Sequence, residues 1–457
     1  MSLKPMPWMH WALGVGAATA SLIGCGTSPA QQPGVSGETG GSAAGAGLTG
    51  GGDGGSAVVS GGAGGTTVAT GGSAGAVSGS SGVGGGAGGG DAPNGNRQAC
   101  TGTVNSTLPP TAPKLQVGVW KDISNPEIPK GNAENMIAQG IAIDPCNYAV
   151  LYWGNTPFDS GNHGGLFKST DAGATWHRVG SVDEPLHVRI DPRDTEHLYV
   201  GDGVRGATLG FWESVDGGKT WEKPAGWTAT AAEVGFIDDL YDVAIDPTDF
   251  DHVLVSSHSA WGWTDTKWNT NAGVLESTDG GDTWSVHEPT DGWGAGHSID
   301  FLYNPELGIG DAKTWLLGTQ GDGYWRTSDG GESWQKVSDS SIFHGGGETY
   351  YSQDGTLYAS SADGLLRSTD NGVTFTKAGA GGGSTGVWGD GKLIYTAPAY
   401  AQGNQPFVTS PDSDGRTWTP QSQPFADSGP FEMTFDPVNK ILYATMWFQG
   451  VWALKVE

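Results

Sequence analysis

The sequence predicts an all-β protein, a seven-bladed β-propeller of four-stranded antiparallel blades. Two internal repeats support this prediction. A turn motif of the form Ser-x-Asp-x-Gly-x-Thr-Trp recurs six times, and an apolar hairpin recurs seven times. Repetition at such a spacing is typical of architectures in which one supersecondary unit is copied around an axis or along a stack.

The turn motif predicts a tight connection between two strands. Its aspartate can accept hydrogen bonds from turn amides, its glycine adopts backbone angles that other residues resist, and its aromatic residue packs under the blade. These aspartates are therefore expected to be structural rather than catalytic. The six copies contain Asp171, Asp216, Asp279, Asp329, Asp370 and, with one inserted residue, Asp412.

The second repeat is an apolar strand, a turn that is usually Asp-Pro, and another apolar strand. Examples are IAIDPCNYAVLYW, VRIDPRDTEHLYV and MTFDPVNKILYAT. Seven such hairpins stand against six turn motifs, and ring closure explains the difference. FQGVWALKV at the C-terminus would supply the third strand of the last blade, and GVWKDIS at 118–124 its fourth. Closure by N- and C-terminal strands leaves no exposed sheet edge.

The N-terminal quarter predicts export and anchoring. Residues 1–25 read as a signal peptide whose end, Leu22-Ile23-Gly24-Cys25, resembles the bacterial lipobox, in which the cysteine is lipidated. Gly26 follows Cys25, which by the same resemblance favours the outer membrane, at the cell surface or on the periplasmic side. Residues 26–97 are rich in Gly, Ser and Ala and are expected to form a disordered tether. The propeller is predicted to occupy 98–457.

Charge and cysteine content restrict the partners. A formal net charge of −27 argues against nucleic acid, because phosphate binding needs clustered Lys and Arg. Cys100 and Cys146 are predicted to form a disulfide in an oxidising compartment. We expect a monomer without a cofactor, whose only membrane contact is the lipid.

The first strands of the hairpins suggest a ring of polar residues. Four positions before the turn stand Gly140, His187, Asp242, Asp300 and Glu432. Glu348, near the irregular turn of the fifth hairpin, is the nearest equivalent there. Carboxyl groups that crowd together shift each other's pKa, which allows one to act as an acid and another as a base. The same ring could instead line a water-filled channel, or hold a structural Ca²⁺ ion. The candidate catalytic residues from this ring are His187, Asp242, Asp300, Glu348 and Glu432.

The longest gap between turn motifs is rich in tryptophan. Indole faces stack on sugars while their N–H groups find polar partners, so these residues predict a carbohydrate groove. The alternative is that they pack a long loop onto the propeller. The candidate substrate-binding residues are Trp261, Trp263, Trp268, Trp293, His297 and Arg205.

The turn motif resembles the Asp-box, or BNR repeat, of sialidases, sortilin-type receptors, photosystem assembly factors and xyloglucan-cleaving endoglucanases. The coupling of IDP hairpins with GLFKSTDAGATW looks most like the last group. That resemblance implies hydrolysis with inversion by two aspartates from two facing propellers, whereas one propeller is predicted here. Asp159 in TPFDSGNHGGLF is the nearest match to the base, and Asp322 in QGDGYW is a weak match to the acid. The three-arginine clamp of sialidases cannot be assembled.

The resemblance and the carboxyl residues together predict a surface glycoside hydrolase that acts on a neutral polysaccharide, such as that of plant cell walls. A lyase that uses His187 or His297 with Tyr241 is a variant of this hypothesis. The alternative is a non-catalytic propeller that binds glycan or protein. Carboxyl groups about 5 Å apart would retain stereochemistry and those roughly 6.5–9.5 Å apart would invert it, and the sequence leaves this open.

Overall fold

The computed structural model describes the following residues: 100–132, 135–157, 163–203, 208–234, 240–257, 273–288, 293, 295–342, 349–379, 384–398, 407–421 and 430–457. The chain divides into two units, Met1–Gly88 and Gly89–Glu457, and all described residues belong to the second. The predicted signal peptide, Cys25 and the tether lie outside the described residues. Within the described part, no helix is long and apolar enough to cross a membrane.

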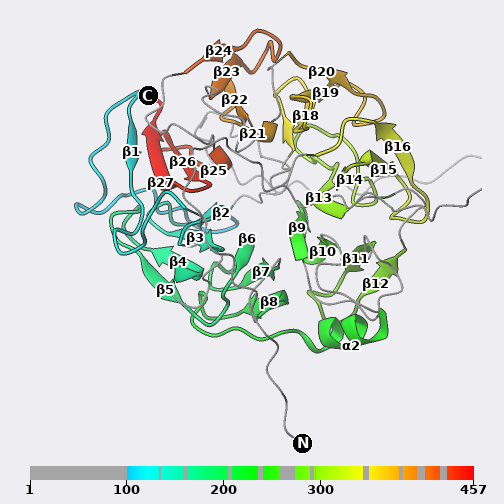
Figure 1. Ribbon diagram of the computed structural model, residues 1–457, viewed down its shortest axis with the longest axis horizontal. Coiled ribbons are helices and arrows are strands. Elements are labelled where there is room, and N and C mark those ends of the chain that lie inside the picture. Colours follow the sequence, from blue (N-terminus) through cyan, green and yellow to red (C-terminus); the bar gives the residue numbers. More distant parts are fainter. Residues whose placement is uncertain are drawn as a thin grey trace, which may run out of the picture. The chain divides into compact units, whose positions relative to one another are not determined.

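The described residues form seven sheets around a common axis, which confirms the predicted propeller (Figure 1). Each blade is a meander, so consecutive strands run from the axis to the rim. Blade 1 contains β2 (Ala138–Ile143), β3 (Leu151–Asn155), β4 (Gly165–Ser169) and β5 (His177–Val179). Blade 2 contains β6 (Pro185–Ile190), β7 (Leu198–Asp202) and β8 (Gly210–Ser214). Blade 3 contains β9 (Leu240–Asp246), β10 (Asp249–Ser257), β11 (Val274–Ser277) and β12 (Ser285–His287).

The remaining blades follow in chain order. Blade 4 contains β13 (Ala295–Phe301), β14 (Trp315–Gln320), β15 (Gly323–Thr327) and β16 (Gln335–Ser338). Blade 5 contains β17 (Tyr350–Tyr351), β18 (Leu357–Ala359), β19 (Leu366–Ser368) and β20 (Thr376–Lys377). Blade 6 contains β21 (Ser384–Gly389), β22 (Leu393–Pro398), β23 (Val408–Pro411) and β24 (Thr419–Pro420). Blade 7 contains β25 (Pro430–Asp436), β26 (Ile441–Met446), β27 (Gly450–Lys455) and β1 (Trp120–Asp122).

The ring closes as the sequence predicts. β1 pairs antiparallel with β27, with Trp120 opposite Leu454 and Asp122 opposite Trp452. The first strand of the propeller therefore completes the blade that the last strands begin, and Figure 1 shows β1 at the rim beside β27.

Blade 2 differs from the predicted four strands. As far as the chain is described, its fourth position is a single bridge between Glu213 and Glu222. Pro224 follows, which cannot donate to a ladder and favours a helix start, and the chain continues as helix α2 (Ala225–Val234). Trp227 of this helix is fully buried against Phe211 and Trp284, so α2 covers the boundary between blades 2 and 3.

The antiparallel order gives the propeller two faces. The turns between the first and second strands and the Asp-box turns between the third and fourth strands lie on one face, which we call the turn face. The connections between blades and between second and third strands lie on the other, the loop face. Apolar side chains of adjacent blades pack between the sheets; one such cluster joins Tyr199 of blade 2 to Val243 and Val253 of blade 3.

The Asp-box turns are built as predicted in five copies. In the first, Asp171 accepts hydrogen bonds from Ser169 Oγ, the Thr175 amide and Thr175 Oγ1, at 2.8–2.9 Å. Gly173 has a φ of 87°, in the left-handed region that glycine tolerates. Equivalent bonds hold the turns at Asp216, Asp279, Asp329 and Asp370.

The sixth box corrects the prediction for Asp412. The inserted residue shifts the turn, so that Asp414 accepts the Thr417 amide at 2.9 Å in place of Asp412. Asp412 is buried and points to blade 5 instead, where it accepts hydrogen bonds from the Tyr350 hydroxyl and the Gln353 amide. Its role is still structural, but it joins two blades rather than one turn.

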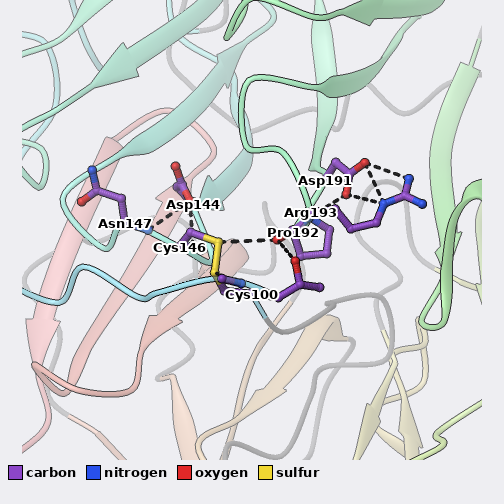
Figure 2. Close-up of a disulfide and its surroundings, with 9 residues drawn as sticks. Cys100, Asp144, Cys146, Asn147, Asp191, Pro192 and Arg193 are labelled. Atoms are coloured by element: carbon purple, nitrogen blue, oxygen red, sulfur yellow. Dashed lines mark hydrogen bonds and ion pairs between the residues drawn. A yellow bond between two sulfur atoms is a disulfide. The ribbon is translucent and has the colours of Figure 1, made fainter.

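The predicted disulfide between Cys100 and Cys146 is present, with a Cα–Cα distance of 5.1 Å. Figure 2 shows it beside the blade 1 turn at Asp144 and the blade 2 turn at Asp191-Pro192. The Thr101 amide donates to the Pro192 carbonyl at 3.1 Å. The start of the propeller is thus attached to the turn face of blades 1 and 2.

Candidate functional site

Charged side chains meet where the inner strands approach the loop face. His187 and Arg189 come from β6, Asp242 from β9 and Glu432 from β25, and we call these four residues the inner charged cluster. All four are at most 8% exposed. They come from blades 2, 3 and 7, which lie next to blade 1 or to each other in the ring (Figure 1).

A repeated β-bulge aims these side chains. Six of the seven described inner strands have one extra residue opposite the second strand near their start. In β6, for example, Pro185 pairs with Asp202 but His187 pairs with Gly201. A bulge bends its strand and redirects the side chains that follow. The polar residues therefore leave the apolar interface between blades.

Asp242 is held by backbone and by charge. Its Oδ2 accepts the Ile299 amide of blade 4 at 3.0 Å, and its Oδ1 accepts the Val243 amide at 2.8 Å. Arg189 donates to Oδ1 at 3.3 Å and to the Val243 carbonyl at 2.6 Å. This carboxylate therefore links blades 2, 3 and 4.

Glu432 connects the last blade to the first two. Its Oε2 accepts the Ile141 amide at 2.7 Å, and its Oε1 lies 3.7 Å from His187 Nδ1 and 3.8 Å from an Arg189 nitrogen. It reaches blade 2 across blade 1 because Gly140 has no side chain. A Cβ at Gly140 would stand 3.4 Å from Glu432 Oε2 and 2.0 Å from the Leu186 carbonyl oxygen.

His187 lies between the two carboxylates, 3.9 Å from Asp242 and 3.7 Å from Glu432. Burial by itself would lower the pKa of His187, but the carboxyl groups of Asp242 and Glu432 outweigh it and raise the pKa above its usual value. A protonated His187 and Arg189 balance the two carboxylates. The cluster can therefore hold a proton on an imidazole between two basic oxygens, and it also joins blades as a buried ion-pair network.

Asp300 does not occupy the position that the sequence alignment predicts. Counting back three residues from the last strand pair before the turn reaches His187 in blade 2 but Ser298 in blade 4. In blade 3, Asp242 stands three residues before Ile245, which pairs with Val253. The blade 4 turn begins at Leu302, whose amide bonds to the Thr314 carbonyl, so its Asn-Pro lies two residues further along than expected. Asp300 instead pairs with Leu316, as Arg189 pairs with Tyr199.

Two predicted groove residues are part of the protein interior. Trp293 is 5% exposed and packs on Trp334 and Trp325 at 5.1 and 6.1 Å between ring centres. His297 is 1% exposed and stacks on Tyr241 at 4.4 Å. Both lie near the loop face, but their rings contact protein, so neither offers a face to a sugar in this structure.

Six of the predicted site residues lie outside the described residues: Asp159, Arg205, Trp261, Trp263, Trp268 and Glu348. Of the family-based assignments, Asp322 is described, and it accepts hydrogen bonds from Trp325 Nε1 at 2.9 Å and Lys336 Nζ at 3.0 Å. Asp322 is therefore engaged on both oxygens within blade 4. Among the described residues, no group of three His, Cys, Asp or Glu is arranged to hold a metal ion.

Two residues near the loop face were not among the predicted catalytic or substrate-binding residues. Arg189 completes the inner charged cluster, and its signal was its position two residues after His187 on the same strand, hence on the same side. Asp202, at the end of β7, is fully buried, and its signal was a charged residue closing an otherwise apolar strand.

Comparisons with known proteins support the resemblance to xyloglucan-type propellers. No protein-family model matches the chain. A xyloglucanase of Hypocrea jecorina is 27% identical over 302 residues, which cover 56% of this chain and 34% of the relative. A xyloglucanase of a Paenibacillus species is 29% identical over 258 residues, covering 47% and 24%. The chain thus spans about a third or less of the length of these curated relatives.

Solved structures agree on the fold. A GH74 xyloglucanase from Xanthomonas campestris superimposes with a TM-score of 0.51 and 17% identity, covering 74% of this chain and 54% of that one. The extracellular domain of a hybrid two-component system from B. thetaiotaomicron gives 0.52 with 10% identity, covering 71% and 40%. At these identities the likeness concerns the propeller alone. The described residues therefore form one seven-bladed propeller, and the chain is similar to part of larger xyloglucanases.

Proposed function

We propose that this propeller is a glycoside hydrolase that acts on a neutral polysaccharide, with xyloglucan as the first substrate to test. The observation that carries the proposal is the similarity to xyloglucanases over about half of the chain. The inner charged cluster is the chemistry that the described residues offer for it. His187 can hold a proton, and Asp242 and Glu432 provide the carboxylates that acid–base hydrolysis requires.

Two observations favour a second candidate, a propeller that binds glycan without cleaving it. The four cluster residues are nearly buried and are held by each other or by backbone groups, and a buried ion-pair network of this kind also serves to join blades. The relatives are also about three to four times longer than the segment they share with this chain.

Hydrolysis of a polysaccharide panel that includes xyloglucan separates the two candidates. We expect new reducing ends from the wild-type protein and a loss of at least about 100-fold in kcat/KM for Asp242→Asn and Glu432→Gln, the scale of removing a general acid or base. Glu306→Gln, which neutralises an exposed residue outside the cluster, is the matched control and should keep full activity. Circular dichroism must show that each variant is folded.

The other outcomes are equally informative. No product from any polysaccharide, with measurable binding by calorimetry, supports the binding module. An active wild type with undiminished Asp242→Asn and Glu432→Gln variants would remove the cluster from catalysis and leave the hydrolase itself standing.

We also propose that the protein is exported and anchored through a lipid on Cys25. The motif Leu22-Ile23-Gly24-Cys25 supports this, as does a disulfide that needs an oxidising compartment. Incorporation of labelled fatty acid that persists in Cys25→Ala would contradict the anchor.

A further inference from the structure

A second group of acidic residues lies at the loop face of blade 2. Asp202, the last residue of β7, has no exposed surface. Its Oδ2 accepts the amides of Asp183 and Glu184, both at 3.2 Å, and lies 2.7 Å from Thr208 Oγ1. Its Oδ1 is buried and has no hydrogen-bond partner. The group joins the segment before β6 to the segment before β8.

The hydrogen bonds of Thr208 do not balance unless a carboxyl group is protonated. Thr208 Oγ1 is within hydrogen-bonding distance of both Asp202 Oδ2 and Asp183 Oδ1. A hydroxyl has one proton to donate, and an ionised carboxylate can only accept. If both aspartates were ionised, one of these two contacts would place acceptor against acceptor. A single carboxylic acid proton completes the chain of bonds Asp183–Thr208–Asp202.

Blade 1 has an amide at the same position. Asn155 ends β3 as Asp202 ends β7, and its Oδ1 accepts the Ile137 amide at 3.0 Å in the way that Asp202 accepts Glu184. The Asn155 Nδ2 donates to the carbonyl of His163, which stands two residues before β4 as Thr208 stands two residues before β8. The contacts of Asp202 lie on one oxygen, Oδ2, rather than on two atoms, but a protonated Asp202 can both accept and donate, as this amide does, and an ionised Asp202 cannot.

We propose that Asp202 is a proton-controlled latch of blade 2. With its proton, the carboxyl group closes the hydrogen-bond chain to Thr208 and Asp183; without it, the chain opens and two neighbouring carboxylates repel each other. This device is independent of the proposed hydrolysis. It sits next to the inner charged cluster, because Gly201, the residue before Asp202, pairs with His187.

The electrostatics agree with this geometry. Burial, increased by the charge of Asp183 and opposed by the hydrogen bonds from Thr208 and the amides of Asp183 and Glu184, raises the pKa of Asp202 to about 7. The titratable groups around it are Asp183 and Glu184 before β6 and His187 within β6. On the side of blade 3, Gly203 lies against the Leu240 backbone, so closely that a Cβ at Gly203 would stand 2.0 Å from the Leu240 carbonyl oxygen.

The sign of the pH effect follows from the raised pKa. The unfolded value is 3.8, so between about pH 4 and 7 the folded protein keeps a proton that the unfolded chain has lost. The contribution of Asp202 to the free energy of unfolding is largest below pH 4. It decreases as the pH rises from about 4 to about 7, and above pH 7 it no longer changes. The ionised latch becomes the main folded form only above about pH 7.

The test compares the wild type with Asp202→Asn, whose side-chain amide accepts the same backbone amides but has no proton to lose in this pH range. Melting temperatures from pH 4 to 9 give the difference between the two proteins, in which the other titrating histidines cancel. We expect the melting temperature of Asp202→Asn to rise relative to that of the wild type between pH 4 and 7. Above pH 8 the difference between the two melting temperatures should be constant. Infrared difference spectra should show a carboxylic acid band that titrates near pH 7 and is absent in Asp202→Asn.

Two further variants assign the proton. Asp183→Asn should keep the acid band, and Asn155→Asp should add a similar pH dependence in blade 1. The proposal is overturned if the melting temperatures of wild type and Asp202→Asn run parallel across this range, if the acid band survives in Asp202→Asn, or if Asp183→Asn rather than Asp202→Asn removes it.

Discussion

Single residues decide how the charged groups at the loop face meet. Glu432 reaches His187 and Arg189 of blade 2 because blade 1 has a glycine between them. Asp242 is bound by two backbone amides, which fixes it before any substrate is present. The contact between Glu432 and blade 2 therefore depends on Gly140 as much as on the charged residues themselves, because a side chain at position 140 would fill the space between them.

The clearest consequence at this scale concerns Gly140. Its Cβ would stand 2.0 Å from the Leu186 carbonyl oxygen, a backbone atom that cannot turn away. We expect Gly140→Ala to lower the free energy of unfolding by about 3 kcal/mol, as overpacking does, and to separate blades 1 and 2. Urea denaturation measures it. Gly102→Ala, whose Cβ would meet only Cys100 Sγ at 3.8 Å, should change stability by less than about 0.5 kcal/mol.

At the scale of elements, blades 2 and 3 each contain a histidine that contacts two carboxyl groups near the turn face, and we call each such arrangement a histidine clamp. His252 at the start of the second strand contacts Asp246 of the inner turn at 3.0 Å and Glu276 of the third strand at 2.9 Å. His197 makes the same pair of contacts with Asp191 and Glu213 in blade 2. Each clamp crosses three strands of one sheet, so it stabilises the blade rather than the ring.

The clamp of blade 3 should make stability depend on alkaline pH. Burial opposes the charge on His252, but its bonds to Asp246 and Glu276 outweigh it and raise its pKa to about 9. The stability from this pairing is complete below pH 6.5 and is lost as the pH rises to about 9, and it amounts to about 3 kcal/mol. His252→Gln should remove this dependence, as measured by urea denaturation at pH 6 and pH 9.5. Equal losses of stability in both proteins would contradict the clamp.

At the scale of the whole propeller, closure depends on contacts between the two ends of the described chain. β1 completes blade 7, and Glu432 of blade 7 accepts the Ile141 amide of blade 1 across 291 positions of sequence. The disulfide attaches the start of this closing segment to blade 1. A closed ring of blades has no free sheet edge, which is the liability that an open array would expose.

Removing the disulfide should weaken closure without changing the fold. The bridge closes a loop of 46 residues, for which loop entropy gives about 4 kcal/mol. We expect the Cys100→Ser, Cys146→Ser double variant to keep its circular dichroism spectrum at room temperature and to melt several degrees lower. Reductant should lower the wild-type melting temperature and leave the double variant unchanged. A reductant effect of similar size in both would show that the bridge is not the cause.

Most of the fold could be predicted because its signals are local and repeated. The box motif encodes its own turn, since Asp171 bonds only residues within four positions. The prediction failed where one inserted residue changed a turn. At Asp412 it moved the box to Asp414, and at Asp300 a longer turn displaced the alignment by two positions.

The candidate site could be predicted only in part. His187, Asp242 and Glu432 were found because each stands as a charged residue in an otherwise apolar inner strand, whereas Arg189 and Asp202 become meaningful only through their neighbours. Trp293 and His297 show the opposite case, in which residues that suggest a groove pack within the interior.

The amino-acid sequence alone determined the blade and the number of hairpins, because these depend on patterns within one repeat. The mismatch between seven hairpins and six boxes then required a ring. The tertiary structure alone decided which charges meet. Bulges set where each inner strand directs its side chains, and Gly140 lets Glu432 cross from blade 7 to blade 2. Those contacts depend on distances between blades, and a linear pattern does not contain such distances.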